Sequence, residues 1–103
     1  MDKHSIIHQI TATKVVAVIR GQDAEEAAQL SKAAVEGGVR AIELTYTTPG
    51  IEEAFKELQN TDALLGAGSV LDSETARHAI LAGANFIVSP YFVNGVAELC
   101  NRY

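Results

Sequence analysis

Residues 41–45 read Ala-Ile-Glu-Leu-Thr, a short apolar run that follows a glycine pair and precedes a threonine-rich turn. Such a run is typical of a buried parallel strand. Its central residue, Glu43, is costly there, because burying an unpaired carboxylate is unfavourable or forces the group to take up a proton. Two interpretations are open: Glu43 pairs with a cation such as Arg20 or Arg40, or its carboxylate takes part in chemistry.

Similar apolar runs occupy residues 15–19, 64–67 and 86–88, and segments with helical periodicity lie between them. Residues 38–43 and 83–88 also echo each other, because each has a helix-ending glycine, two linking residues and a strand. A repeated unit favours stacked strand–helix modules, in which crossovers make the strands parallel and helices cover the sheet. The predicted fold class is therefore α/β, with an N-terminal helix that packs at the end or edge of the sheet.

The helices between the predicted strands have recognisable ends. The first begins after Asp23, an N-cap with Glu26 three residues later, and ends at Gly37. The others are expected to start after Gly50, at Asp72 or Ser73, and at Val93. The buried stripe of the first helix is expected to consist of Ala27, Ala28, Leu30, Ala34 and Val35.

Length and composition predict one small globular domain over residues 1–103, of which 48% are hydrophobic and 20% charged. The net charge of −5 comes without a basic cluster, so neither nucleic acid nor an anionic membrane surface is an expected partner. The apolar stretches are too short to span a membrane, and the N-terminus lacks a secretory signal pattern. We therefore expect a cytoplasmic protein without a membrane partner.

The sequence predicts neither a metal site nor a cofactor. Cys100 has no cysteine or histidine at ligand spacing and is interpreted as a small apolar residue on a helix. His4 and His8 share a helical face, but the glutamate of an HExxH zinc site is absent.

Polar residues gather where the predicted strands end, which is where parallel β/α proteins place their functional groups. Arg20 ends the first apolar run, Thr45 ends the second, Ser69 follows the third and Pro90 follows the fourth. Side chains alternate along a strand, so Glu43 shares a face with Thr45 and points inward if the apolar residues between them face the helices. We expect these groups to lie on one rim of the sheet.

The glycines of the segment Gly-Ala-Gly-Ser at residues 66–69 let a ligand approach the backbone, and the Ser69 hydroxyl is a hydrogen-bond donor. As a phosphate cradle the segment is weak, because neither the P-loop nor the dinucleotide fingerprint is completed.

Five motifs, in this order along the chain, resemble the N-terminal half of the KDPG/KHG aldolases. This family comprises the 2-dehydro-3-deoxy-phosphogluconate and 4-hydroxy-2-oxoglutarate aldolases. The motifs are Val-Ala-Val-Ile-Arg at residues 16–20, Glu-Gly-Gly-Val at 36–39, Ile-Glu-Leu-Thr-Tyr-Thr-Thr-Pro at 42–49, Gly-Ala-Gly-Ser-Val at 66–70, and Ala-Gly-Ala-Asn-Phe-Ile-Val-Ser-Pro at 82–90.

The resemblance implies a (β/α)8 TIM barrel, usually trimeric, that cleaves a 2-keto-4-hydroxy acid to pyruvate and an aldehyde without a metal. A lysine forms a Schiff base with the keto carbon in such enzymes. By the same resemblance, Glu43 shuttles protons, Arg20 lies near the pyruvate carboxylate and Ser69 supplies a hydroxyl where the family has threonine. Thr47 stands where some members place a carboxylate-binding arginine. Thr45 and Pro90 belong to matching motifs and complete the predicted substrate-binding set.

The family's barrel is about twice as long as this chain, and its Schiff-base lysine lies on the sixth strand. The lysines here are Lys3, Lys14, Lys32 and Lys56, none of them at the end of a predicted strand. The resemblance therefore implies that this chain lacks the nucleophilic lysine and is inactive alone.

Three accounts are open: a piece of a longer aldolase, a half-barrel that pairs with another copy, or a binding module for the pyruvate moiety of a keto acid. A homo-oligomer is expected, because open parallel strands leave exposed edges. An alternative outside the enzyme class is a four-strand flavodoxin-like domain that binds a small anion or a partner protein. That alternative does not explain a carboxylate in mid-strand.

Overall fold

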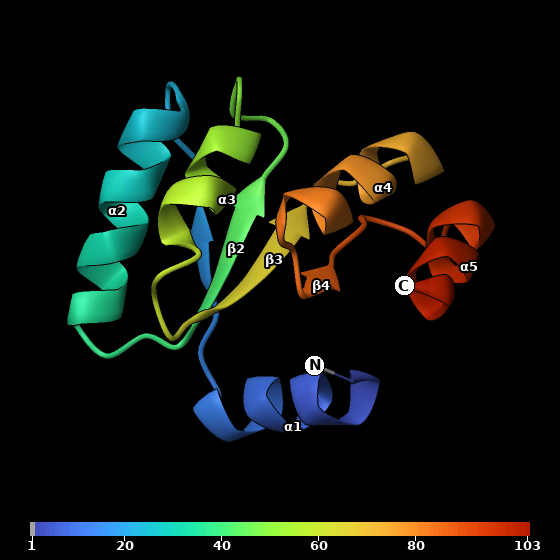
Figure 1. The fold of residues 1–103 in the computed structure, drawn as a ribbon, viewed down its shortest axis with the longest axis horizontal. Helices are drawn as coiled ribbons and strands as arrows, with labels where there is room; N and C mark the ends of the chain where they lie inside the picture. The colour runs from blue at the N-terminus through green and yellow to red at the C-terminus, as the bar shows by residue number, and fades with distance from the viewer. Residues whose placement is uncertain (1) are drawn as a thin grey trace.

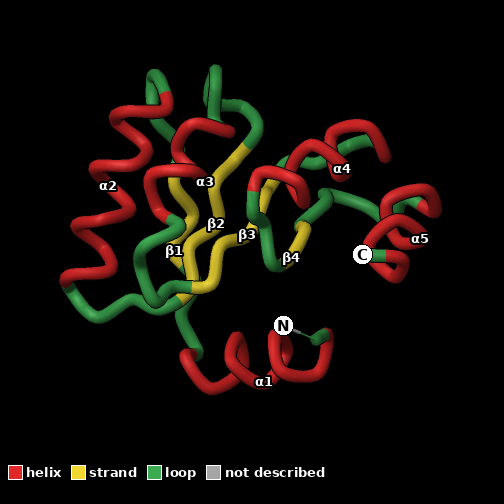
Figure 2. The backbone as a smooth tube through the Cα atoms, viewed as in Figure 1, coloured by secondary structure: helices red, strands yellow, loops and turns green. Residues whose placement is uncertain are grey.

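The computed structural model describes residues 2–103 and consists of alternating helices and strands, as the sequence predicted. Figures 1 and 2 show the elements, which are α1 (Lys3–Thr13), β1 (Ala17–Ile19), α2 (Ala24–Glu36), β2 (Ala41–Thr45), α3 (Glu52–Leu58), β3 (Leu64–Gly68), α4 (Ser73–Ala82), β4 (Phe86–Ile87) and α5 (Asn94–Arg102).

The four strands form one parallel sheet in the order β1-β2-β3-β4, so each strand pairs with its neighbour in the sequence. The barrel-type arrangement implied by the resemblance has this order, in which each strand is followed by a helix. A flavodoxin-like domain would place β1 between β2 and β3. The observed order therefore excludes that alternative as a description of the fold.

Helices α2, α3 and α4 lie side by side over one face of the sheet, and α1 crosses below the N-terminal ends of the strands (Figure 1). The core lies between the sheet and these helices. Ile42 and Leu44 of β2 contribute to it from the sheet, and Phe55 and Leu58 of α3 from the helix layer, all with no exposed surface. Alternation along β2 therefore directs Glu43 to the opposite face, as predicted.

The start of α2 follows the predicted capping pattern, with one difference. The Asp23 carboxylate accepts a hydrogen bond from the Glu26 amide at 2.9 Å, whereas the Glu26 carboxylate accepts from the Gln22 amide at 3.0 Å, one residue before the cap. After Glu36 the chain turns through Gly38, which has a φ of +106° and thereby requires the conformational freedom of glycine.

The prediction that Leu30 lies in the buried stripe of α2 is wrong, because its side chain is 46% exposed. The stripe runs instead through Ala27, Ala28 and Ser31, which recur at the i, i+1, i+4 spacing of one helical face. Ser31 is buried at a cost that its hydroxyl offsets by donating to the Ala27 carbonyl at 2.8 Å.

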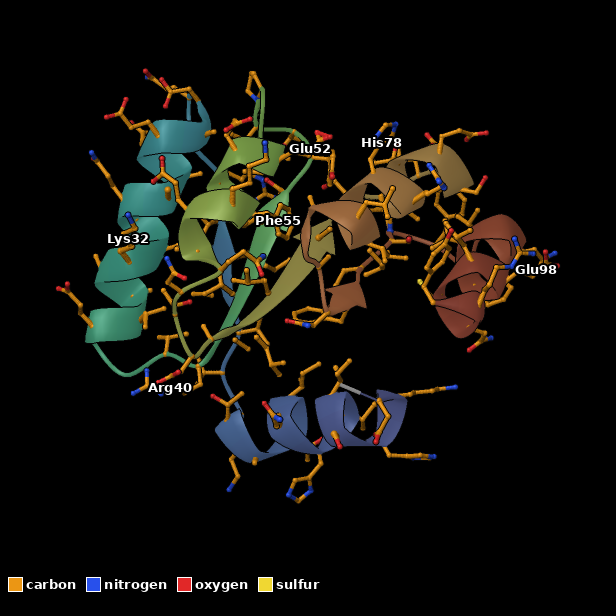
Figure 3. All side chains as sticks on the ribbon, in the orientation of Figure 1. Lys32, Arg40, Glu52, Phe55, His78 and Glu98 are labelled. Atoms are coloured by element: carbon orange, nitrogen blue, oxygen red, sulfur yellow. The ribbon has the colours of Figure 1, made fainter. Side chains whose placement is uncertain are left out.

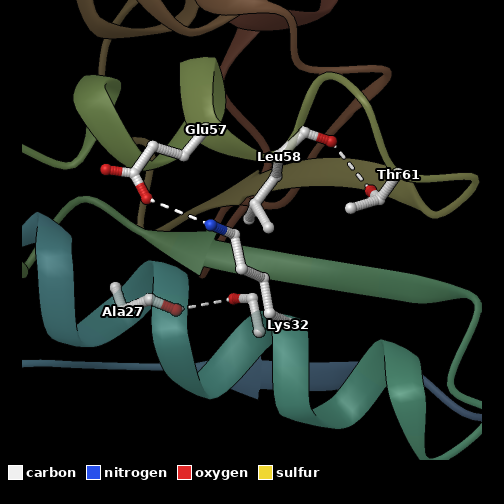
Figure 4. A network of polar contacts seen from close by, with 6 residues as sticks. Ala27, Lys32, Glu57, Leu58 and Thr61 are labelled. Atoms are coloured by element: carbon white, nitrogen blue, oxygen red, sulfur yellow. Dashed lines mark hydrogen bonds and ion pairs between the residues drawn. The ribbon is translucent and has the colours of Figure 1, made fainter.

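Helix α2 packs against α3 through its small buried side chains, and Phe55 of α3 belongs to the same buried core (Figure 3). Across this contact the Lys32 ammonium lies 3.5 Å from the Glu57 carboxylate (Figure 4). Both side chains are about half exposed, so the pair adds little stability. At the end of α3, the Thr61 hydroxyl donates to the Leu58 carbonyl at 2.8 Å.

The strands start and end close to the predicted positions. β1 begins at Ala17 and not at Val15, because its pairing with β2 starts with Ala17 opposite Ile42. α4 begins after its predicted cap, Asp72, whose carboxylate accepts from the Thr75 amide at 2.7 Å. No helix in the described part of the chain is both long and apolar enough to cross a bilayer.

Candidate active site on the inner face of the sheet

The site is built on the sheet face that the helices leave uncovered, toward the C-terminal ends of the strands. Because the strands are parallel, these ends meet along one edge. Ile19 pairs with Leu44, and Thr45 pairs with Gly68, so Arg20 and Ser69 follow directly on either side of the end of β2. The structure thus brings Arg20, Glu43, Thr45 and Ser69 to one region.

Glu43 lies across the neighbouring strand β3. In register it is opposite Val18 on one side and Gly66 on the other, with Phe86 next along the row. A Cβ atom added to Gly68 would clash with Oε2 of Glu43, and one added to Gly66 would clash with the Phe86 ring. The two glycines therefore leave room for a carboxylate and an aromatic ring on the same face.

Burial raises the pKa of the Glu43 carboxyl above its usual value, and the nearby positive charge of Arg20 offsets part of this rise. Within residues 2–103, Glu43 forms no ion pair. Arg40 lies before the N-terminal end of β2 and donates to the carbonyls of Val35 and Val39 at 3.1 and 3.3 Å. The interpretation of Glu43 as half of a structural ion pair is therefore not supported by the geometry.

Arg20 is exposed, but the backbone on both sides of it is held by β2 and its turn. The Thr45 hydroxyl donates to the Ile19 carbonyl at 3.2 Å, and the Gly21 amide donates to the Thr48 hydroxyl at 3.1 Å. Thr48 was not predicted as a site residue. The available signal was the three threonines within residues 45–48 at the end of β2, but the partners of Thr45 and Thr48 lie at the end of β1 and in the loop after it.

Thr47 is exposed, and its hydroxyl lies 3.0 Å from the Thr45 hydroxyl. A hydroxyl carries one hydrogen, and that of Thr45 is donated to Ile19. Thr47 must therefore be the donor in this contact. In this arrangement its hydrogen points inward, away from a ligand at the rim.

Ser69 has a φ of +60°, in the left-handed region that favours glycine. Holding a serine there costs about 1 kcal/mol, and strain of this kind concentrates at functional sites. The loop is tied to the end of β4, because Val70 donates to the Val88 carbonyl at 3.2 Å. Pro90 follows two residues later and is exposed, but β4 is two strands from β2, roughly 10 Å away. The sheet order therefore separates Pro90 from Glu43.

The four lysines lie away from this rim. Lys3 and Lys14 belong to α1 and its C-terminal cap at the opposite end of the sheet. Lys32, labelled in Figure 3, and Lys56 lie on the outer helices α2 and α3. They pair with Glu57 and Glu53 at 3.5 and 3.4 Å.

Two further observations on titratable side chains concern the chemistry available at the site. In the described part of the chain, His, Cys, Asp and Glu side chains form no cluster of three that could hold a metal ion. Tyr46 packs against the core, and burial together with the Glu52 carboxylate raises the pKa of its hydroxyl to about 12. Tyr46 is thus a poor acid or base near neutral pH. The polar groups at the rim are the Glu43 carboxyl, which can transfer a proton, and the Arg20 guanidinium and Ser69 hydroxyl, which can donate hydrogen bonds to an anion.

The chain is similar in sequence to a known protein family and to several curated proteins. A family model described as KDPG and KHG aldolase matches residues 6–103. The 2-dehydro-3-deoxy-phosphogluconate aldolase of Treponema pallidum is 37% identical over 98 residues, which are 93% of this chain and 47% of that protein. The KHG/KDPG aldolase of Escherichia coli K12 is 36% identical over 83 residues, 79% of this chain and 39% of that protein. The chain spans about half the length of the curated relatives it matches.

The fold of the chain is also similar to solved structures of aldolases. The 2-keto-3-deoxy-6-phosphogluconate aldolase of Zymomonas mobilis ZM4, crystallised with 3-phosphoglycerate, superposes with a TM-score of 0.85 at 28% identity, over 98% of this chain and 49% of that one. KDPG aldolase from Legionella pneumophila gives a TM-score of 0.78 at 32% identity, over 89% of this chain and 46% of that one. In that structure pyruvate is captured as a covalent carbinolamine intermediate.

Proposed function

The chain belongs to the KDPG and KHG aldolase family, and we propose that it supplies the proton-transfer and carboxylate-binding part of a class I aldolase site. The reaction is cleavage of a 2-keto-4-hydroxy acid to pyruvate and an aldehyde. The observation that carries the proposal is Glu43, a carboxyl with a raised pKa that lies on the inner face beside Arg20 and against Gly68.

Glu43 suits the proposed proton transfers. Schiff-base formation and carbon–carbon cleavage each move a proton, and the enamine of pyruvate must gain one at its methylene carbon. A carboxyl with a raised pKa is both a better base than an ordinary carboxylate and closer to being an acid at neutral pH. We assign Glu43 to accept and return these protons in turn.

Arg20 is the group we assign to the carboxylate of the pyruvate moiety. A guanidinium is planar, stays charged and can donate two parallel hydrogen bonds to a carboxylate. Arg20 is exposed and forms no ion pair within residues 2–103, so its donors are free for a ligand. Ser69 adds a hydroxyl donor, and the exposed residues Thr47 and Pro90 are proposed to line the outer part of the site, whereas Thr45 is fully buried beneath it.

The lysine that carries the keto carbon in class I aldolases has no counterpart at this rim among residues 2–103. We propose that it is provided by a polypeptide segment other than this one, which closes the sheet into a barrel. Reduction with borohydride in the presence of pyruvate should then leave the 103-residue chain without a pyruvate adduct, as measured by intact mass. A stable adduct on one of the four lysines would contradict this assignment.

Deuterium exchange at the pyruvate methyl group tests Glu43 directly. The assay uses a chimera in which this chain replaces the matching half of the Zymomonas mobilis aldolase, with which it superposes at a TM-score of 0.85. Glu43→Gln should slow exchange by about a hundredfold or more, because loss of a general base typically costs that much. The control is Glu36→Gln, which removes an exposed carboxylate at the end of α2. Exchange that survives in folded Glu43→Gln would count against the proposed function.

A further inference from the structure

We propose that Thr45 and Thr48 are positioning residues that hold the backbone of Arg20 from both sides and so set where its guanidinium lies relative to Glu43. This assigns Thr45 a role through Arg20 in place of a direct substrate contact. The inference rests on the proposed function of Arg20 and adds the residues on which that function depends.

Two hydrogen bonds hold the backbone on either side of Arg20. Thr45 donates to the carbonyl before Arg20, at 3.2 Å, and Thr48 accepts from the amide after it, at 3.1 Å. The two threonines thus hold the backbone on either side of a single residue. The Gly21 side of this loop is also confined by α2, because a Cβ there would lie 3.0 Å from the Ala27 nitrogen and the Asp23 carbonyl oxygen.

Both threonine side chains are buried. Thr45 has no exposed surface and Thr48 only 2%, so neither hydroxyl can reach a substrate at the rim without rearrangement. A buried hydroxyl or amide that loses its partner bears the full cost of desolvation. The hydrogen bonds of Thr45 and Thr48 with the Arg20 loop are therefore favoured over states in which these polar groups are buried without a partner.

The turn that carries both threonines is itself held by backbone hydrogen bonds. The Thr48 amide donates to the Thr45 carbonyl at 3.1 Å, which closes the turn, and the Tyr46 amide donates to the Gly68 carbonyl at 2.9 Å. The turn is thus fixed to β3 as well as to the Arg20 loop. Because Ser69 follows Gly68, this turn links the backbone next to Arg20 with the backbone next to Ser69.

The effect of the Arg20 charge on the pKa of Glu43 gives a way to measure where the guanidinium lies. The positive charge of Arg20 lowers the pKa of Glu43 against the larger effect of burial, yet the two groups form no ion pair. If this clamp, the two hydrogen bonds of Thr45 and Thr48 with the Arg20 loop, is released, the guanidinium moves farther from Glu43 and the effect of its charge on the carboxyl weakens. The pKa of Glu43 should then rise toward its value in a variant without the Arg20 charge.

The test uses the 103-residue chain, with two NMR measurements on each variant: the pKa of the Glu43 carboxyl carbon and hydrogen exchange of the Gly21 amide. Thr48→Val removes the acceptor while keeping the side-chain shape, and Thr45→Val removes the donor on the other side. In Thr48→Val we expect the Gly21 amide to exchange at least about tenfold faster, because it loses its partner. In both variants the Glu43 pKa should shift in the direction of Arg20→Gln.

Rescue and control variants separate positioning from general structure. Thr48→Ser and Thr45→Ser keep the hydroxyls and should restore both measurements. Thr61→Val removes a hydroxyl that caps α3, far from the Arg20 loop, and should change neither. Circular dichroism checks that each variant is folded, and if one valine variant unfolds, the other decides the question.

An unchanged Glu43 pKa in Thr48→Val and Thr45→Val, where Arg20→Gln shifts it, would overturn the clamp. So would serine variants that behave like the valine variants. If Arg20→Gln itself leaves the Glu43 pKa unchanged, the Gly21 exchange rate decides: no increase in Thr48→Val overturns the clamp. Failure of the proposed function is read separately, as methyl exchange that persists in Glu43→Gln.

Discussion

Glu43 shows how a single side chain can be placed at a cost to the fold. Its position on the inner face follows from strand alternation, and the sequence was sufficient to predict it. The residues that surround it were only partly predictable. The hydrogen bond of Thr48 with the Gly21 amide joins two loops that are distant in the sequence, and no local pattern specifies this contact or the left-handed φ of Ser69.

Glu43→Gln should make the folded chain more stable at neutral pH. The pKa of Glu43 is raised in the fold above its ordinary value of 4.5, so the contribution of this group to stability is fully present below that value and is lost as pH rises through the folded pKa. Glutamine removes this loss. Urea denaturation at about pH 7 should therefore show a higher free energy of unfolding for Glu43→Gln than for wild type.

The same comparison at about pH 3.5 should show little difference, because Glu43 is then mostly protonated. Glu36→Gln is the matched control, since Glu36 is exposed at the end of α2. A destabilised Glu43→Gln at pH 7 would mean that the ionised carboxylate is favourably solvated in the fold, contrary to the raised pKa.

At the scale of elements, helix ends were predicted better than strand ends. Asp23 and Asp72 cap α2 and α4 as predicted, because a capping side chain and its amide partner are three residues apart in the sequence. Strand limits depend on pairing instead. β4 pairs only over Phe86 and Ile87, and β1 starts where β2 can meet it. Leu30 was misplaced because a strip of alanines defines the buried face of α2 more weakly than larger residues would.

Lys14 offers a test at the end of α1. It is the C-cap of this helix and has a φ of +61°, a left-handed conformation that is costly for any residue with a Cβ. Lys14→Gly should raise the free energy of unfolding by about 0.5–1 kcal/mol, measured by urea denaturation. Lys14→Ala, which also loses the charge, should not. Equal effects of the two substitutions would contradict the left-handed cap.

At the scale of the molecule, α2, α3 and α4 cover one face of the sheet, and the opposite face keeps exposed apolar side chains in the described part of the chain. Val18 on this inner face is 49% exposed, and Val88, at the end of β4, is 38% exposed. The order of elements and the parallel sheet were predictable, because strand-like and helix-like periodicity alternate along the sequence. The surroundings of the inner face could not be predicted in the same way, because local sequence patterns do not specify what packs against side chains such as Val18 and Val88.

Phe55 tests whether the sheet and its helix layer unfold as one unit. It is a large, fully buried side chain that lies between α3 and the sheet core. Phe55→Ala should cost about 3–5 kcal/mol, a large part of the stability of a small domain. Phe55→Leu keeps most of the volume and should cost far less.

For both Phe55 variants, far-UV circular dichroism and hydrogen exchange of the β2 and β3 amides should report the same loss of stability. If the β2 and β3 amides stay protected while α3 unfolds in Phe55→Ala, the molecule consists of separable units and this expectation is wrong.

The order of strands in the sheet has a consequence for biosynthesis. A ribosome releases the chain from the N-terminus, and in this sheet β2, β3 and β4 each pair with the strand made just before them. Each of these strands therefore finds a partner already synthesised, and β1 waits only for the next strand in the sequence. Because neighbouring strands are also close in sequence, closing each connection loses little chain entropy. The fold can thus be assembled in the order in which it is translated.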